Sequence, residues 1–135
     1  MKSLTVLVAL LLLIAKIQAQ NLLEIEISGI RNSRGEILLQ LFNEKQEIIG
    51  QRKGAVSDGK CLIRFEDLKP GRYAVRYFHD ENLSGKMETG FLGIPKEGFG
   101  FSNNAAIRFG PPSFDKWLFN LTANLKLELK ITYFD

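Results

Sequence analysis

Apolar and polar side chains alternate along most of the chain after residue 20. This alternation predicts β-strands, because successive side chains of a strand point to opposite faces. The segments that carry it are 21–30, 36–43, 60–66, 71–80 and 125–133. Shorter strands are predicted at 106–109 and 117–122, whereas 44–51 is ambiguous and is compatible with a short helical turn. No stretch has a helical period, so the pattern indicates an all-β protein.

Turn residues separate the predicted strands. The polar run 31–35 ends in Gly35, and Pro70 with Gly71 forms a tight turn before the strand at 71–80. We expect 21–30 and 36–43 to pair as a hairpin. About seven short strands with such turns are typical of an antiparallel Greek-key β-sandwich, prealbumin-like or immunoglobulin-like, in which 80–105 forms one long loop.

Residues 1–19 have the layout of a signal peptide. Lys2 precedes an apolar run over 4–15, and the small Ala19 stands before Gln20. A run of this length is too short to span the roughly 30 Å core of a bilayer comfortably, although a membrane anchor is the alternative. We therefore expect an exported protein with one folded domain at 20–135 and no membrane span after cleavage.

Charge and cysteine content narrow the classes of function. The chain has 18 basic and 15 acidic side chains, which alternate without a basic run, so we expect no nucleic-acid partner. Cys61 is the only cysteine, which rules out an intrachain disulfide. Its place in an alternating run predicts that the thiol is buried.

Two motifs carry a resemblance to known families. The run LKPGRYAV at 68–75 resembles the turn and strand of prealbumin-like sandwich domains, which include B-type repeats of bacterial adhesins and carboxypeptidase regulatory-like domains. The longer pattern FHDEN, GK, T, FLGIPKEGFGFSNNA and FGPPSF resembles a bacterial exported family known as domain of unknown function 2141. That resemblance implies a periplasmic, extracellular or cell-envelope location in a Gram-negative bacterium, and it implies no enzymatic activity.

A candidate cation site follows the strand at 71–80. Its residues are Asp80, Asn82, Ser84, Lys86 and Glu88, in the spacing D-x-N-x-S-G-K-x-E. Alternate oxygen ligands and a glycine resemble the first part of an EF-hand loop, because a hard cation needs several converging oxygens. The neutral Ser84, and Phe91 in place of the usual bidentate glutamate, predict at most a weak calcium site. The alternative is that Asp80, Asn82 and Ser84 cap turns through side-chain-to-backbone hydrogen bonds.

His79 is the only histidine and is a candidate general base. A zinc site would need further His or Cys ligands, and Cys61 alone is available. Adjacent residues of a strand point to opposite faces, so Asp80 is a poor partner for His79. A small hydrolase that uses His79 and loop carboxylates such as Glu88 is therefore the alternative to a non-catalytic protein.

Glycine, phenylalanine and asparagine are concentrated in 90–104, a composition that suits a sugar- or peptide-binding surface. The candidate ligand residues are His79, Phe91, Phe99, Phe101, Asn103 and Asn104. Alternatively, the phenylalanines plug one end of the sandwich, opposite Phe109, Phe114 and Trp117. The sequence favours a non-catalytic binding or structural module of the cell envelope, with a glycan or an envelope protein as its partner.

Overall fold

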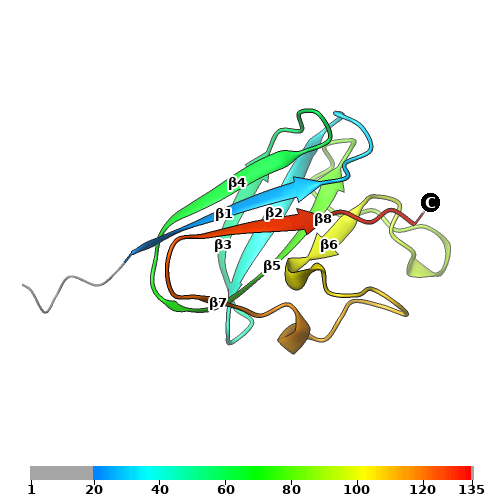
Figure 1. Cartoon of the computed structure of the whole chain (residues 1–135). Coiled ribbons are helices and arrows are strands. Elements are labelled where there is room, and N and C mark those ends of the chain that lie inside the picture. The colour runs from blue at the N-terminus through cyan, green and yellow to red at the C-terminus, as the bar shows by residue number, and fades with distance from the viewer. Residues whose placement is uncertain (1–19, 135) are drawn as a thin grey trace, which may run out of the picture.

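The computed structural model describes residues 20–134 and consists of two β-sheets that face each other (Figure 1). The strands are β1 Asn21–Ser28, β2 Glu36–Asn43, β3 Ile48–Gly54, β4 Cys61–Leu68, β5 Gly71–Asp80, β6 Phe99–Phe101, β7 Phe119–Leu121 and β8 Leu125–Lys130. Three short 3-10 turns complete the elements: η1 Phe91–Gly93, η2 Ser102–Asn104 and η3 Phe114–Lys116. The predicted all-β sandwich is confirmed, and the predicted signal peptide at 1–19 lies outside the described residues.

The first sheet has the order β4-β1-β8 and the second has the order β3-β2-β5-β6, with β7 also paired to β5. Most neighbours are antiparallel, but β1 and β8 run parallel, from Leu23 opposite Leu125 to Ser28 opposite Lys130. The predicted antiparallel sandwich is therefore confirmed, with β1 and β8 as a parallel pair within it. Figure 1 shows β1 and β8 side by side with their arrowheads at the same end.

The predicted hairpin between the first two strands is wrong, because β1 and β2 lie in different sheets. Gly29 has a φ angle of 78°, which favours glycine, and turns the chain after β1. Ile30 beyond it is buried. The connection therefore crosses the edge of the core and starts the second sheet instead of folding back beside β1.

The main core fills the space between the sheets. The inward residues of the alternating strands form it, and several of them have no exposed surface: Leu23, Ile25, Ile27, Ile37, Val75 and Leu121. Cys61 belongs to this core, as predicted, and burial raises the pKa of its thiol to about 11. The thiol is therefore protonated and unreactive at neutral pH.

A second apolar cluster lies outside this core and contains Phe42, Ala74, Phe99, Phe101 and Trp117. The Trp117 ring contacts the Phe42 and Phe101 rings, with centroids 5.4 and 4.7 Å apart. The buried Ser102 hydroxyl accepts the Val75 N–H at 3.0 Å and donates to the Trp117 carbonyl, which ties β5 to the segment before β7. The long segment after β5 thus folds back over the second sheet.

Three element boundaries differ from the sequence prediction. Residues Ile48–Gly54 form β3 rather than a helical turn; most of its residues are exposed at the sheet edge, so burial imposes no alternation on them. The loop predicted at 80–105 is divided by β6, so that β3 and β6 are gained and the strand predicted at 106–109 is lost, which gives eight strands in place of about seven. Residues 106–109 form no strand, and Pro111 and Pro112, which cannot donate to a ladder, follow directly.

Candidate functional site

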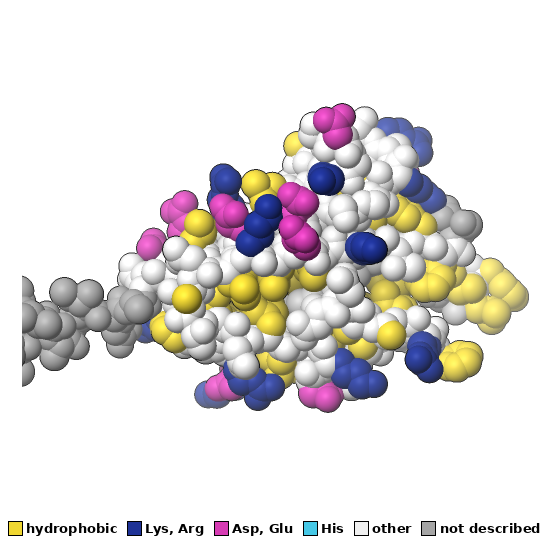
Figure 2. All heavy atoms as spheres, in the orientation of Figure 1, with side chains coloured by type: hydrophobic (Ala, Val, Ile, Leu, Met, Phe, Trp, Pro, Cys, Tyr) yellow, Lys and Arg dark blue, Asp and Glu magenta, His cyan; other side chains and the backbone are white. Residues whose placement is uncertain are grey.

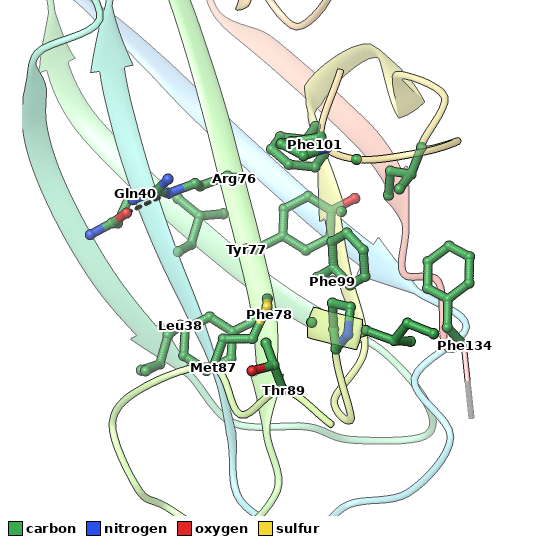
Figure 3. Close-up of a pocket in the computed structure, with 18 of the residues that line it drawn as sticks. Leu38, Gln40, Arg76, Tyr77, Phe78, Met87, Thr89, Phe99, Phe101 and Phe134 are labelled. Atoms are coloured by element: carbon green, nitrogen blue, oxygen red, sulfur yellow. Dashed lines mark hydrogen bonds between the residues drawn. The ribbon is translucent and has the colours of Figure 1, made fainter. Parts of the chain in front are cut away.

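A groove with a volume of about 1020 Å³ lies on the outer face of the second sheet. We call it the outer groove. Its floor comes from β2, β5 and β6, and two loops, 85–95 and 107–111, form its walls. The side chains labelled in Figure 3 are Leu38, Gln40, Arg76, Tyr77, Phe78, Met87, Thr89, Phe99, Phe101 and Phe134.

The alternation of β2 and β5 explains the floor. Leu39 and Tyr77 point into the core, so their neighbours face the other side of the sheet. In the register of the strands, Leu38 lies opposite Phe78, and Phe78 lies opposite Phe99. The outward positions thus form an apolar row across three strands, with the half-buried Phe78 in the middle.

Exposed hydrophobic side chains surround the groove. Leu92 is 81 % exposed and Phe109 is fully exposed, and both contribute to the walls, while Phe91, which precedes Leu92 in the chain, is 85 % exposed. Figure 2 shows hydrophobic and basic side chains next to one another at the right-hand end of the molecule, where loops project beyond the sandwich in Figure 1. Apolar side chains this exposed and this concentrated mark interaction surfaces in soluble proteins.

The wall at 85–95 is held by backbone hydrogen bonds. The Gly90 N–H donates to the Ile94 carbonyl at 2.8 Å, and the Lys96 N–H donates to the Glu88 carbonyl at 2.9 Å. Leu92 has a φ angle of 60°, in the left-handed region that a non-glycine residue seldom adopts. The backbone therefore presents Leu92 to the groove at a cost in local strain.

The charged residues that line the groove are all basic. Arg52, Lys53, Arg76 and Arg108 are among the lining residues, and within the described chain no aspartate or glutamate lines the groove. The Arg76 Nε donates to the Gln40 Oε1 at 2.7 Å, as the dashed line in Figure 3 marks. The groove thus combines an apolar floor with a positive potential.

The candidate cation loop is largely satisfied by its own donors. The Asp80 side chain is 1 % exposed; its Oδ1 accepts the Ser84 N–H at 3.0 Å and its Oδ2 accepts the Gly85 N–H at 2.8 Å. The Asn82 Nδ2 donates to the Glu88 Oε1 at 2.5 Å. This is the arrangement of a capped turn. The calcium site proposed for Asp80, Asn82, Ser84, Lys86 and Glu88 stays a prediction.

One further glutamate, Glu97, supports the same loop. The buried Glu97 carboxylate accepts the backbone N–H of Glu81 at 2.8 Å and that of Glu88 at 3.2 Å. Among residues 20–134 no group of three or more His, Cys, Asp or Glu side chains is arranged to hold a metal ion. The same described part of the chain has no helix with the length and apolar character needed to cross a membrane.

His79 lies on the core face of β5 with no exposed surface. Its Nε2 is 2.6 Å from the Arg34 carbonyl oxygen, so this nitrogen carries the proton, because a carbonyl only accepts. Its Nδ1 is 2.9 Å from the Tyr133 hydroxyl, which also accepts the Arg31 N–H at 3.2 Å. Both ring nitrogens are therefore engaged inside the fold.

The candidate ligand residues separate into two groups. Phe99 and Phe101 both line the outer groove, and Phe91 directly precedes the wall residue Leu92. The side chains of Asn103 and Asn104 instead hold the backbone: Asn103 donates to the Lys116 and Leu118 carbonyls, and Asn104 accepts the Lys130 N–H. The structure therefore brings Phe99 and Phe101 to the outer side of the sheet and places His79 on the opposite face.

Sequence reasoning missed the polar part of the groove. Gln40 and Arg76 are outward residues of β2 and β5, opposite each other in the ladder. The alternation of apolar and polar residues did indicate that both side chains point outward, because the residues next to them in each strand are core residues. Without the pairing of β2 with β5, these two positions had no reason to be considered together.

The comparisons with known proteins give a family but no activity. Residues 25–128 match the family model DUF2141, described as an uncharacterized protein conserved in bacteria. No curated protein and no solved structure matched the chain.

Proposed function

The chain belongs to the DUF2141 family of uncharacterized proteins conserved in bacteria, and from its geometry we propose that it is a non-catalytic module that binds an elongated apolar ligand in the outer groove. The observation that carries the proposal is the groove itself. Its volume of about 1020 Å³ is at the upper end of the roughly 300–1,000 Å³ typical of small-molecule sites. Such sites are largely apolar with a few polar groups, as this one is.

The histidine supports a binding role over catalysis. A general base needs a nitrogen within reach of a substrate proton, and both nitrogens of the fully buried His79 face the Arg34 carbonyl and the Tyr133 hydroxyl. The outer groove lies on the other face of β5. A hydrolase built on His79 therefore has no support from the site geometry.

The proposed location is the periplasm, the cell envelope or the extracellular space of a Gram-negative bacterium. The signal-peptide pattern of residues 1–19 supports this, as does membership of a bacterial family. The prealbumin-like subtype of the sandwich also belongs to the proposal, supported by the LKPGRYAV motif that forms the turn into β5.

The test measures binding of a neutral naphthylamine probe by its fluorescence, using residues 20–135. We expect saturable binding that Phe78→Ser weakens by about tenfold or more. Burial of a phenylalanine contributes about 1.5–3 kcal/mol, and about 1.4 kcal/mol corresponds to tenfold in affinity.

Leu62→Ser is the matched control, because Leu62 is a 46 % exposed hydrophobic residue on the outer face of the first sheet. We expect this variant to bind the probe like the unchanged domain. Equal binding by Phe78→Ser and the unchanged domain would overturn the outer groove as the binding site.

A further inference from the structure

We propose that the ligand of the outer groove is a single-chain fatty carboxylate, with its carboxylate bound by Arg76 and its acyl chain along the apolar floor. This inference rests on the proposed function and specifies its ligand class. Four features of the groove support it: the sign of its charge, the free edge of the Arg76 guanidinium, the separation of its polar and apolar sides, and its elongated shape.

The charge of the lining selects an anionic ligand. Four basic side chains line the groove, Arg52, Lys53, Arg76 and Arg108, and none of the described residues that line it is acidic. Lys53 is partly neutralised, since its Nζ lies 3.3 Å from Glu36 Oε1. Arg76 and Arg108 form no ion pair with any residue between 20 and 134. An anion entering the groove therefore meets an uncompensated positive charge.

Arg76 is held in position on one side and free on the other. Its Nε donates to the Gln40 Oε1 at 2.7 Å, and its guanidinium carbon lies 5.1 Å from the centroid of the Phe42 ring. The two terminal nitrogens make no hydrogen bond to another described residue. A guanidinium with a free pair of terminal nitrogens matches a carboxylate with two parallel hydrogen bonds. Because Gln40 and Phe42 already hold the side chain, binding costs less conformational entropy.

The groove has a polar side and an apolar side. The register places Gln51 opposite Gln40, and Gln40 opposite Arg76. Figure 3 shows the Gln40–Arg76 pair on one side of the view and Phe99 and Phe134 on the other. A ligand that satisfies both sides has an anionic head at one end and a hydrocarbon body at the other.

The shape of the site favours one extended chain over a compact ring. The apolar surfaces continue from the floor residue Phe78 to the wall residues Met87, Leu92 and Ile94. The groove lies along a sheet between two loops and is not a closed chamber, so a flexible chain contacts the floor and both walls at once. Hydrocarbon burial scales with the area removed from water, and such a path maximises that area.

The test compares three ligands of equal chain length: laurate, dodecanol and dodecyl phosphate. Each is titrated against the domain 20–135 at a concentration below that of micelle formation, by displacement of the naphthylamine probe. We expect laurate to bind at least about tenfold tighter than dodecanol, since hydrogen bonds to charged groups are the strong ones. The preference is expected to decrease as salt is raised.

Arg76→Gln is expected to remove the preference for laurate over dodecanol and to leave dodecanol binding unchanged. Arg72→Gln is the matched control, because Arg72 is exposed and lies on the same face of β5 but outside the groove. It is expected to keep the preference. Arg76→Lys retains the charge without the paired donors, and an intermediate preference is expected.

The outcomes separate the two proposals. Equal binding of laurate and dodecanol, both sensitive to Phe78→Ser, would overturn the fatty carboxylate and leave the apolar groove standing. Tighter binding of dodecyl phosphate than of laurate would also overturn the carboxylate assignment. Failure of all three ligands to displace the probe, together with a probe signal unaffected by Phe78→Ser, would overturn the proposed function itself.

Discussion

His79 illustrates how one residue can be chemically suggestive in the sequence and structural in the fold. The ring lies on the core face of β5 and joins two distant segments, through the Arg34 carbonyl before β2 and the Tyr133 hydroxyl after β8. The Arg31 guanidinium lies over the Tyr133 ring, 4.5 Å from its centroid. The histidine therefore contributes to holding the segment before β2 and the segment after β8 together.

We expect His79→Leu to lower the free energy of unfolding by about 3 kcal/mol, because a buried carbonyl and a hydroxyl lose their partner. Tyr133→Phe removes one of these bonds and should cost about 1 kcal/mol. Urea denaturation measures both, and the double variant should cost less than the sum, since the residues share a hydrogen bond. Probe binding by the folded His79→Leu variant should be unchanged. Loss of probe binding would instead show that His79 takes part in the binding site.

Glu81 lies close to this part of the fold, and its ionisation makes the stability of the domain depend on pH. Burial opposes its ionisation, but hydrogen bonds from Asn32 and Arg31 and the charge of Arg31 outweigh burial and lower the pKa of Glu81 below its ordinary value. Its Oε2 accepts the Asn32 Nδ2 at 2.9 Å, and its Oε1 accepts the Arg31 Nε at 3.0 Å. The folded state therefore favours the ionised carboxylate.

A lowered pKa in the folded state gives a stability that is complete above the ordinary pKa and is lost as pH falls through the folded pKa. We expect the difference in free energy of unfolding between the unchanged domain and Glu81→Gln to be largest at neutral pH and to shrink through this acidic window. Asn32→Ala, which removes one donor, should reduce the difference. Urea denaturation at a series of pH values measures it, and a difference independent of pH would contradict the assignment.

At the scale of elements, the turn after β5 is built by carboxylates that accept backbone N–H groups. Asp80 closes residues 80–85 through the Ser84 and Gly85 N–H groups, and Glu97 holds the backbone at Glu81 and Glu88. The loop positions the wall of the outer groove that begins at Gly85. Hydrogen bonds between residues of the chain itself therefore fix the conformation of this loop.

The capped-turn alternative predicts the same thermal midpoint of the domain in millimolar calcium and in EDTA, because both Asp80 oxygens already accept backbone N–H groups. Asp80→Ala should lower the free energy of unfolding by about 2 kcal/mol in either solution. A rise of the midpoint with calcium that Asp80→Ala abolishes would instead establish the cation site predicted from the spacing of this loop.

The strands at 21–28, 36–43, 61–68 and 71–80 were predicted from the sequence, because each buries one face and the alternation records it. β3 and β6 were not: β3 is largely exposed at an edge, and the three residues of β6 are too few to show a period. In the candidate site, Phe99 and Phe101 were predicted, but Gln40 and Arg76 were not. Their proximity depends on the pairing of β2 with β5, which follows from the fold as a whole.

At the scale of the whole molecule, the two outer faces differ. The first sheet carries a ladder of exposed charges, in which the Arg64 Nε lies 2.9 Å from Glu24, and Lys60 and Lys126 each lie 3.7 Å from Glu26. Such pairs contribute little stability and keep this face in water. The second sheet is covered by the segment after β5 and holds the outer groove. The sandwich therefore has one solvated side and one side adapted for binding.

The parallel pairing of β1 with β8 has a consequence for the timing of folding. β1 is the first strand of the domain and β8 is the last, so β1 lacks one neighbour until nearly the whole chain has been synthesised. Contacts between segments so distant in sequence are slow to form, because a long loop must close first. A protein exported as we propose has to cross a membrane, and slow folding leaves the chain incompletely folded for longer. Because only the final strand completes the first sheet, we expect the chain to stay incompletely folded during export.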